Sequence, residues 1–397
     1  MTKKSLVLTI LIILLFYTTA SALVLDTDVY TMDFRINNPG ARANAMGGAF
    51  TGVADDATAA YTNPAGLAIL TAPEVSVEYK NSGLVNRLTL GPGVHKDYED
   101  RVYGISFLSY VHPKDNATFA VYRHQLLDLE SSFPLGTATN KLDITADVLA
   151  VGMGFKLSDS FSLGASFGFA ELDYYFQAKK TDGVPGDFIY LVDGEDKDQY
   201  YSASLLWSPA DLFNLGLVYR YGPEFTTHKD IYRWDNLYSR DFVLQDKIEN
   251  TLKVPDVYSL GLSFRLFSSV TLAADVNHVM YSQLKKNLKL LPLMAGGNDL
   301  DYIEIDDEQE YHVGLEYVFN AGATPMALRC GYYFRPEHKF YTTNKSIPAS
   351  SLTMPGEDDH IYSGGIGFVA SEKVQIDMAA SIGEFIDEYI LSMVYRF

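Results

Sequence analysis

The side chains that could do chemistry in this chain do not fall into a catalytic or metal-binding pattern. One cysteine, Cys330, is too few for an internal disulfide or a cysteine-based metal cluster. The eight histidines are scattered, and no nucleophile motif such as G-x-S-x-G stands out. Six acidic residues between positions 299 and 308 offer oxygen ligands for Ca²⁺, but their spacing is not that of an EF-hand, which favours a solvated loop. The sequence therefore predicts neither an enzyme nor a cofactor or metal site.

Four arginines are candidates for ligand binding. In residues 325–335, apolar side chains alternate with Arg329 and Arg335, so these two arginines share the opposite face. The same alternation turns Arg220 and Arg265 away from the apolar faces of their own segments. In a partly dry interior, such a guanidinium would form a strong charge-assisted contact with a fatty-acid carboxylate. The alternative is that these cations balance acids on the same face, namely Asp147, Asp275, Glu316 and Asp377.

Aromatic residues are the second group of candidates. The chain holds 28 Tyr and 23 Phe but only 2 Trp, a surplus that suits strands with one apolar and one wet face. Four phenylalanines in connecting segments could form a groove that first captures a hydrophobic molecule, although such residues also pack beneath loops: Phe133, Phe225, Phe242 and Phe340.

The elements that must position these residues show a period of two. In the last eleven residues, one face carries Tyr389, Leu391, Met393, Tyr395 and Phe397, whereas Glu388, Ser392 and Arg396 lie on the other. Helices do not repeat with this period. One face suits lipid and the other suits water, which is typical of a strand in a membrane barrel.

The same pattern predicts fourteen strands. They lie near residues 73–80, 101–111, 117–124, 146–157, 160–176, 200–208, 213–225, 257–266, 269–282, 309–319, 325–335, 361–370, 373–382 and 387–397. Long and short connections alternate between them, as expected when short periplasmic turns face long outward loops. A soluble β-sandwich requires no such alternation. The prediction is an all-β fold: a fourteen-stranded antiparallel transmembrane barrel over residues 73–397.

The amino terminus indicates export. Residues 1–22 combine Lys3 and Lys4, an apolar stretch and the small-x-small site Ala20-Ser21-Ala22, as a cleaved signal peptide does. Beyond it no run of 18 apolar residues occurs, so a membrane-resident chain would have to be a closed barrel. The net charge of -19 argues against a nucleic-acid partner. We expect an outer-membrane protein with acidic outward loops and both termini in the periplasm.

Residues 23–72 precede the first strand and do not alternate. They are rich in Ala and Gly and contain Asp55-Asp56-Ala57-Thr58-Ala59, which reads as the start of a short helix that Asn63-Pro64 ends. Such a segment is either an extended linker or a plug folded into the barrel. Its apolar residues and capping pattern favour the plug.

These stretches resemble a known family. Three stretches resemble the N-terminal hatch of the FadL/TodX-type outer-membrane transporters of long-chain fatty acids and hydrophobic compounds. They are Met46-Gly47-Gly48-Ala49-Phe50, the helix start at Asp55-Asp56-Ala57-Thr58-Ala59, and Asn63-Pro64-Ala65-Gly66-Leu67. The length, the fourteen strands and the terminal Tyr395-Arg396-Phe397, which resembles the signal read by the barrel-insertion machinery, agree with it.

The resemblance implies passive, diffusion-driven uptake of lipids or aromatic hydrocarbons by a monomer in outer-membrane lipid. It assigns gating to the hatch, with Met46, Gly47, Gly48, Asn63, Pro64 and Ala65 as its residues. Two alternatives remain open. Fourteen-stranded barrels with a similar hatch serve protein secretion or surface attachment through protein contacts, and a general porin would instead have an open aqueous channel.

Overall fold

The structure is a computed structural model that describes residues 36, 38–91, 94–135, 138–180, 187–235, 241–267, 269–286, 303–338, 340–343 and 357–397. The predicted signal peptide, residues 1–22, lies outside this described part. So do residues 299–302, the first part of the acidic run 299–308. No helix among the described residues is long and apolar enough to cross a membrane.

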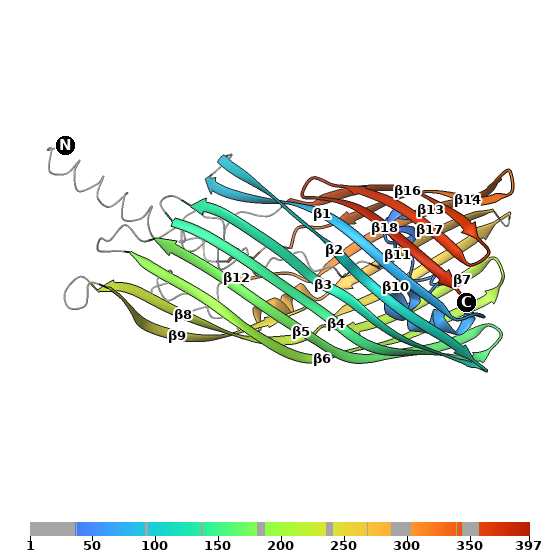
Figure 1. Ribbon diagram of the computed structural model, residues 1–397, viewed down its shortest axis with the longest axis horizontal. Coiled ribbons are helices and arrows are strands. Elements are labelled where there is room, and N and C mark those ends of the chain that lie inside the picture. Colours follow the sequence, from blue (N-terminus) through green and yellow to red (C-terminus); the bar gives the residue numbers. More distant parts are fainter. Residues whose placement is uncertain are drawn as a thin grey trace.

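Fourteen antiparallel strands close into a barrel (Figure 1). The main sheet has sixteen strands, of which β8 and β9 form a hairpin outside the ring, and β1 closes the ring by pairing with both β2 and β18. The predicted barrel is therefore confirmed. Its strands are β1 Glu74–Gly91, β2 Val94–Lys114, β3 Ala117–Leu135, β4 Ala138–Ser158, β5 Phe161–Lys180, β6 Phe188–Ala210, β7 Phe213–Tyr221, β10 Val257–Leu266, β11 Val270–Val279, β13 Glu308–Ala321, β14 Thr324–Arg335, β16 Asp359–Ser371, β17 Val374–Ile382 and β18 Ile386–Arg396.

Several strands are much longer than predicted. The expected strand 117–124 is β3, which continues to Leu135. The expected 20-residue loop after residue 80 is mostly a β-hairpin, because β1 ends at Gly91 and β2 begins at Val94. The alternation that marks a strand requires one apolar face. Where a strand continues beyond the lipid, its outward face becomes polar and its inward face apolar, as in β3, where Leu127 and Leu129 are buried and Glu130 is exposed.

The expected long connection between residues 225 and 257 also contains strands. β8 (Glu224–Asp235) and β9 (Asp241–Lys253) pair with each other, and β8 pairs with the first residues of β6. A second small pair, β12 (Ile303–Glu304) with β15 (Tyr341–Thr342), links two further connections. The end of the barrel that carries these two pairs of strands is called the long-loop end below. The opposite end, with the turn at residues 159–160, is called the short-turn end.

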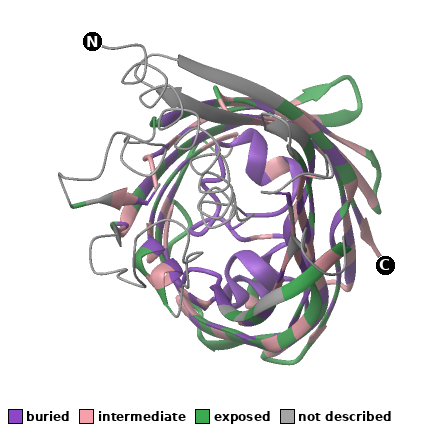
Figure 2. Cartoon of the chain, turned by 90° about the vertical axis from the view of Figure 1, so that its left-hand side faces the viewer, coloured by how far each residue is buried: buried purple, intermediate pink, exposed green. Residues whose placement is uncertain are grey.

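Burial alternates along the strands as the period of two requires (Figure 2). In β4, outward Leu149, Val151 and Met153 are exposed whereas inward Val148 and Ala150 are buried. Cys330 is exposed on the outward face of β14, as the sequence predicted. A band of exposed apolar side chains therefore surrounds the barrel.

Residues 38–72, called the lumenal segment below, lie inside the ring of strands (Figure 2). This segment contains α2 (Ala41–Ala45), α3 (Ala59–Thr62) and the 3₁₀ helix η2 (Pro64–Ile69). α2 contacts β16 and β17, and η2 contacts β4 and β5, so the segment spans the lumen at the short-turn end.

Candidate functional site in the lumen

The Met46-Gly47-Gly48 motif is a close contact between the lumenal segment and the wall. Gly47 and Gly48 have φ values of 65° and 78°, a left-handed conformation that side chains disfavour. A Cβ on Gly47 would lie 2.7 Å from the backbone nitrogen of Tyr332. Across the contact, a Cβ on Gly331 of β14 would lie 2.0 Å from the Gly47 nitrogen. Glycine is needed on both sides because the two backbones touch.

The Asn63-Pro64-Ala65 motif anchors the other end of the segment. The Asn63 side chain accepts a hydrogen bond from the Ala65 backbone nitrogen (3.1 Å) and donates to the Thr51 carbonyl (2.9 Å). Pro64 occupies the first turn of η2, where a missing N–H costs nothing. The Ala65 nitrogen also donates to Ser204 Oγ of β6 across 2.9 Å. These residues bind the segment to itself and to the barrel.

A buried network of charges joins the segment to the wall on the opposite side. Arg42 of α2 contacts Asp55 at 2.5 Å and donates two hydrogen bonds to Glu316 of β13, at 2.8 and 2.9 Å. Glu316 also accepts from Arg329, which contacts Asp377 at 2.7 Å. Burial raises the pKa of the neighbouring Asp56, and Arg42 opposes that rise. The sequence did not single out Arg42; the signal that could have found it is that it is the one charged residue in the Ala- and Gly-rich stretch 38–50.

The four arginines predicted as ligand contacts lie in different surroundings. Arg329 pairs with Glu316 and Asp377, and Arg335 pairs with Asp359 at 3.2 Å, so both follow the charge-balancing alternative. Arg265 has the inward register but lies beside the turn at the short-turn end, where its side chain is 54% exposed and 4.0 Å from Asp55. Arg220 is buried against the lumenal segment.

Of the lumenal acids expected to pair with arginine, Asp275 does not follow the prediction. Its Oδ2 accepts hydrogen bonds from the backbone nitrogens of Phe50 (2.9 Å) and Thr51 (2.8 Å). Asp147 pairs with Arg123 at 2.8 Å, a cation that the sequence did not single out. The carboxylate of Asp275 therefore holds the lumenal segment rather than a barrel cation.

The candidate phenylalanines are not gathered in one loop groove. Phe225 is the second residue of β8 and Phe340 precedes β15, and both belong to one large buried apolar cluster. Phe242 lies in β9 and is partly buried, and Phe133 lies in β3, outside the residues whose side chains are described. The expected groove is thus replaced by an interior cluster.

This cluster lines the lumen from the long-loop end to the lumenal segment. Beside Phe225 and Phe340 it includes inward side chains of many strands and three of the lumenal segment's larger residues: Phe107, Leu127, Ile144, Leu172, Tyr190, Val257, Tyr61, Leu67 and Leu70. The arrangement offers an apolar environment to a hydrophobic molecule along most of the barrel.

Connecting segments fold over the long-loop end of the cluster. In the 3₁₀ helix η3 (Tyr281–Lys285), the Tyr281 ring stacks on His338 at 4.5 Å and its hydroxyl donates to Glu310. Burial and the nearby Arg335 guanidinium lower the pKa of His338 to about 4. His338 is therefore neutral at pH 7 and packs as an aromatic ring.

The barrel wall is interrupted between β2 and β3. Their pairing runs only from Lys114↔Ala117 to Phe107↔His124, although both strands continue far beyond. Just past that point β3 has a bulge, where its register with β4 shifts between Gln125 and Leu127. The Tyr61 ring of α3 lies 3.9 Å from the His124 ring. The interruption therefore borders both the apolar cluster and the lumenal segment.

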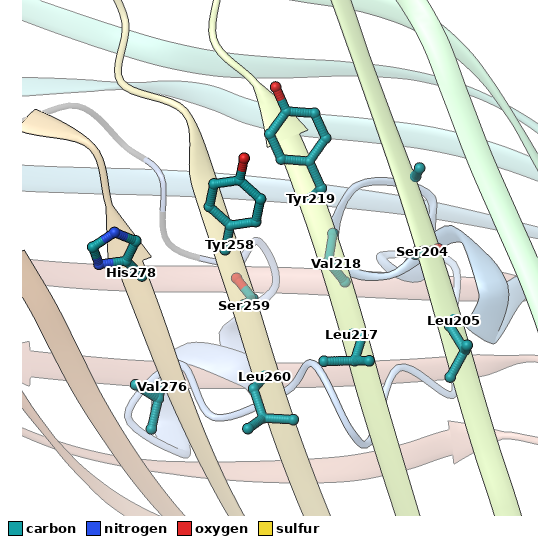
Figure 3. A pocket seen from close by; sticks show the side chains of 11 residues that line it. Ser204, Leu205, Leu217, Val218, Tyr219, Tyr258, Ser259, Leu260, Val276 and His278 are labelled. Carbon is teal, nitrogen blue, oxygen red and sulfur yellow. The ribbon is translucent and has the colours of Figure 1, made fainter. Parts of the chain in front are cut away.

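A separate groove of about 620 Å³ lies on the outward face of the wall (Figure 3). Its larger side chains come from the outward register of neighbouring strands, among them Leu217, Tyr258 and Leu260, which are exposed. This groove belongs to the lipid-facing surface. Among the described residues, no cluster of His, Cys, Asp or Glu is arranged to hold a metal ion.

Comparison with known proteins gives one family. The model of the family described as outer membrane protein transport protein (OMPP1/FadL/TodX) matches residues 30–385. No curated protein matches the sequence.

Solved structures resemble the fold at low sequence identity. A FadL homologue from Pseudomonas aeruginosa is 16% identical, with a TM-score of 0.67 over 92% of this chain and 99% of that one. The toluene transporter TbuX of Ralstonia pickettii is 13% identical, with a TM-score of 0.63 over 91% and 99%. The toluene transporter TodX of P. putida is 12% identical, with a TM-score of 0.60 over 91% and 99%.

Proposed function

Because this chain belongs to the outer membrane protein transport protein (OMPP1/FadL/TodX) family, we propose that it lets hydrophobic molecules diffuse across the outer membrane, with the lumenal segment as its gate. The observation that carries the proposal is the apolar cluster, which extends through the lumen and ends on Tyr61 and Leu67 of that segment. A water-filled pore gives a hydrophobic molecule no advantage, whereas an apolar lining replaces the membrane as its solvent.

We place the long-loop end outside the cell and the short-turn end in the periplasm, as in other outer-membrane barrels. A molecule would enter beneath η3 and its neighbouring connections, where Leu284 and Phe340 are buried. It would then follow the apolar cluster toward Tyr61. No step consumes energy or needs a cofactor, because the concentration gradient drives the passage.

Such a molecule could leave the lumen by two routes. One leads sideways through the interruption between β2 and β3, which begins at Phe107 and His124. The other leads past the lumenal segment and requires the contacts at Gly47 and Asn63 to loosen. The lateral exit has the more apolar border, since Phe107, Leu126 and Leu127 are buried there.

Uptake measurements test the proposal. Cells that depend on this protein should take up radiolabelled toluene or hexadecanol. Deleting Leu126, the extra residue of the β3 bulge, should lower the rate of uptake, because it should restore the pairing of β2 with β3 beyond His124. Leu126→Ala, which keeps the extra residue of the bulge, is the matched control. Equal uptake with and without the protein would contradict the transport function, and normal uptake by the correctly assembled Leu126 deletion would contradict the lateral exit.

A further inference from the structure

The interruption between β2 and β3 is bordered by a β-bulge in each strand. In β2, the register against β1 skips Ser106, which is therefore an extra residue. In β3, the register against β4 skips Leu126 in the same way. A bulge bends its strand and increases the local twist. Two bulges thus coincide with the point where β2 and β3 stop pairing, and each helps to turn its strand away from the other.

The interruption removes backbone partners from the wall. The last pair of residues in the β2–β3 ladder is Phe107↔His124, and the described parts of the two strands do not pair beyond it. A backbone carbonyl that borders lipid without a donor is costly, because the membrane interior offers no water in its place. The carbonyl groups of β2 past Phe107 therefore need a donor from elsewhere.

The side chain of Arg123 in β3 supplies such a donor. Its Nη1 donates a hydrogen bond to the Ile105 carbonyl of β2, across the interruption. Its Nη2 lies 2.8 Å from each carboxylate oxygen of Asp147 in β4. One guanidinium thus links β2 to β4, and the charge of Asp147 strengthens its hold. At this point a side chain closes the wall in place of the backbone ladder.

Arg123 and Asp147 both lie on the outward face of the barrel. Arg123 shares the register of exposed Val121, and Asp147, expected among the lumenal acids, shares that of exposed Leu149. About a third of each charged side chain is exposed, 34% for Arg123 and 36% for Asp147. A cation among lipid-facing residues lowers the stability of a barrel, so its presence there calls for a physical explanation.

The bridge made by Arg123 lies across the route from the apolar cluster to the membrane. On the lumenal side of the interruption, Leu126 and Leu127 are buried in the cluster. On the lipid side, Ile105 and Leu149 are exposed. A hydrophobic molecule that leaves through the interruption therefore meets apolar surface before and after the bridge, and the guanidinium is a polar obstacle between the two.

We propose that Arg123 is a latch on the lateral exit. Its bridge to Ile105 and Asp147 holds the interruption closed on the lipid side, and release of the bridge lets a molecule pass into the membrane. The inference rests on the proposed transport function and adds the regulation of its exit. Release requires a rotamer change in one side chain, which is far faster than separation of paired strands. The latch delays bulky molecules more than small ones, because a small molecule needs less of the opening.

The reactivity of one cysteine at the interruption tests the latch without relying on transport. In a Cys330→Ala background, Leu126→Cys places a thiol at the β3 bulge and keeps the extra residue. The full-length protein in lipid vesicles is labelled with N-hexadecylmaleimide, which partitions into the membrane. Arg123→Met, which keeps the length of the side chain but removes its donors, should raise the labelling rate about fivefold. Arg123→Lys, whose single amine cannot bridge both acceptors, should raise it less. Lys197→Met is the matched control, because Lys197 pairs with Glu171 at 2.9 Å on the outward face where β5 and β6 pair without interruption.

Uptake by cells separates the latch from the transport function. Arg123→Met should speed the uptake of pyrene, a bulky hydrocarbon, more than that of toluene. If Arg123→Met and Lys197→Met label and take up both hydrocarbons at the wild-type rate, the latch is overturned while the transport function stands. If the wild-type protein carries neither hydrocarbon, the proposed function itself fails. A heat-dependent gel shift verifies that each barrel has assembled. Asp147→Asn, which keeps Arg123 but removes its counter-ion, should also speed labelling and replaces Arg123→Met if that variant does not assemble.

Discussion

His312 of β13 lies 2.7 Å from the backbone carbonyl of Gly47, through its Nδ1. A carbonyl only accepts, so Nδ1 carries the proton and donates this hydrogen bond. The contact joins a barrel strand to the glycine pair of the lumenal segment, and both partners are buried. A single side-chain substitution can remove this link.

Replacing His312 with Phe should loosen the lumenal segment. The phenyl ring keeps the stacking with Tyr333, whose ring centroid is 5.1 Å away, but it leaves the Gly47 carbonyl unpaired, at a cost of about 1–3 kcal/mol. In planar lipid bilayers we expect more frequent current openings than for the wild type. His360→Phe, which alters an exposed histidine on the outward face, should behave as wild type. Identical gating of both variants would show that the contact does not hold the gate.

Replacing Gly164 with Ala should destabilise the contact between η2 and the wall. An added Cβ would lie 2.1 Å from the Ala65 nitrogen, so either β5 or the Asn63-Pro64-Ala65 anchor must move. Overpacking of this kind costs about 1–3 kcal/mol. Urea-induced unfolding in lipid vesicles measures it, with Gly104→Ala as the control because nothing lies within 4 Å of its added Cβ. Equal stability of the two variants would argue that the segment is not pressed against the wall.

The ion network should show coupling between the segment and the barrel. Arg42→Met removes the cation of the 2.8 Å ion pair between the two side chains, and Glu316→Gln removes its negative charge. In a double-mutant cycle, their combined effect on unfolding should be smaller than the sum of the single effects by about 1–2 kcal/mol. Strict additivity would mean that the two charges are independently solvated.

The long-loop end should weaken in acid because of His338. Its pKa is lowered to about 4 in the folded protein, below the ordinary value of about 6.5. The unfolded state therefore takes up a proton first as the pH falls. The contribution of neutral His338 to the free energy of unfolding is fully present above pH ~6.5. It is lost as the pH falls toward 4, and the loss reaches up to ~3 kcal/mol.

Limited proteolysis across that pH range measures the change. Cleavage within residues 336–343 should increase from pH 7 to pH 4 in the wild type, and much less in His338→Phe, which keeps the stacking with Tyr281 but cannot be protonated. A wild-type digestion pattern that is independent of pH would contradict the assignment.

Sequence periodicity identified the parts of the barrel that face lipid, and little beyond them. Cys330 lies on the outward face of β14 and Arg329 on its inward face, as the alternation of apolar and polar residues predicted. A strand that separates lipid from water must alternate apolar and polar side chains. The extension of β3 from residue 124 to Leu135 was missed, because its apolar side chains, Leu127 and Leu129, face the lumen instead of lipid, and a bulge at Leu126 interrupts the alternation. The hairpin of β8 and β9 was missed because its apolar residues, among them Phe225, Ile231 and Leu252, are buried in the interior cluster and do not form a lipid-facing stripe.

By itself, the sequence determined the closed barrel, the lipid-facing residues and the two motifs of the lumenal segment, because strand alternation, glycine conformation and Asn-Pro capping are local properties. Only the tertiary structure decided the role of each inward charge. Arg220 and Arg329 share residue type and register, yet Arg329 meets Glu316 and Asp377, whereas Arg220 meets the carbonyl groups of Tyr61 and Thr62. Their partners come from distant parts of the chain, and closure of the ring around the lumenal segment brings them together.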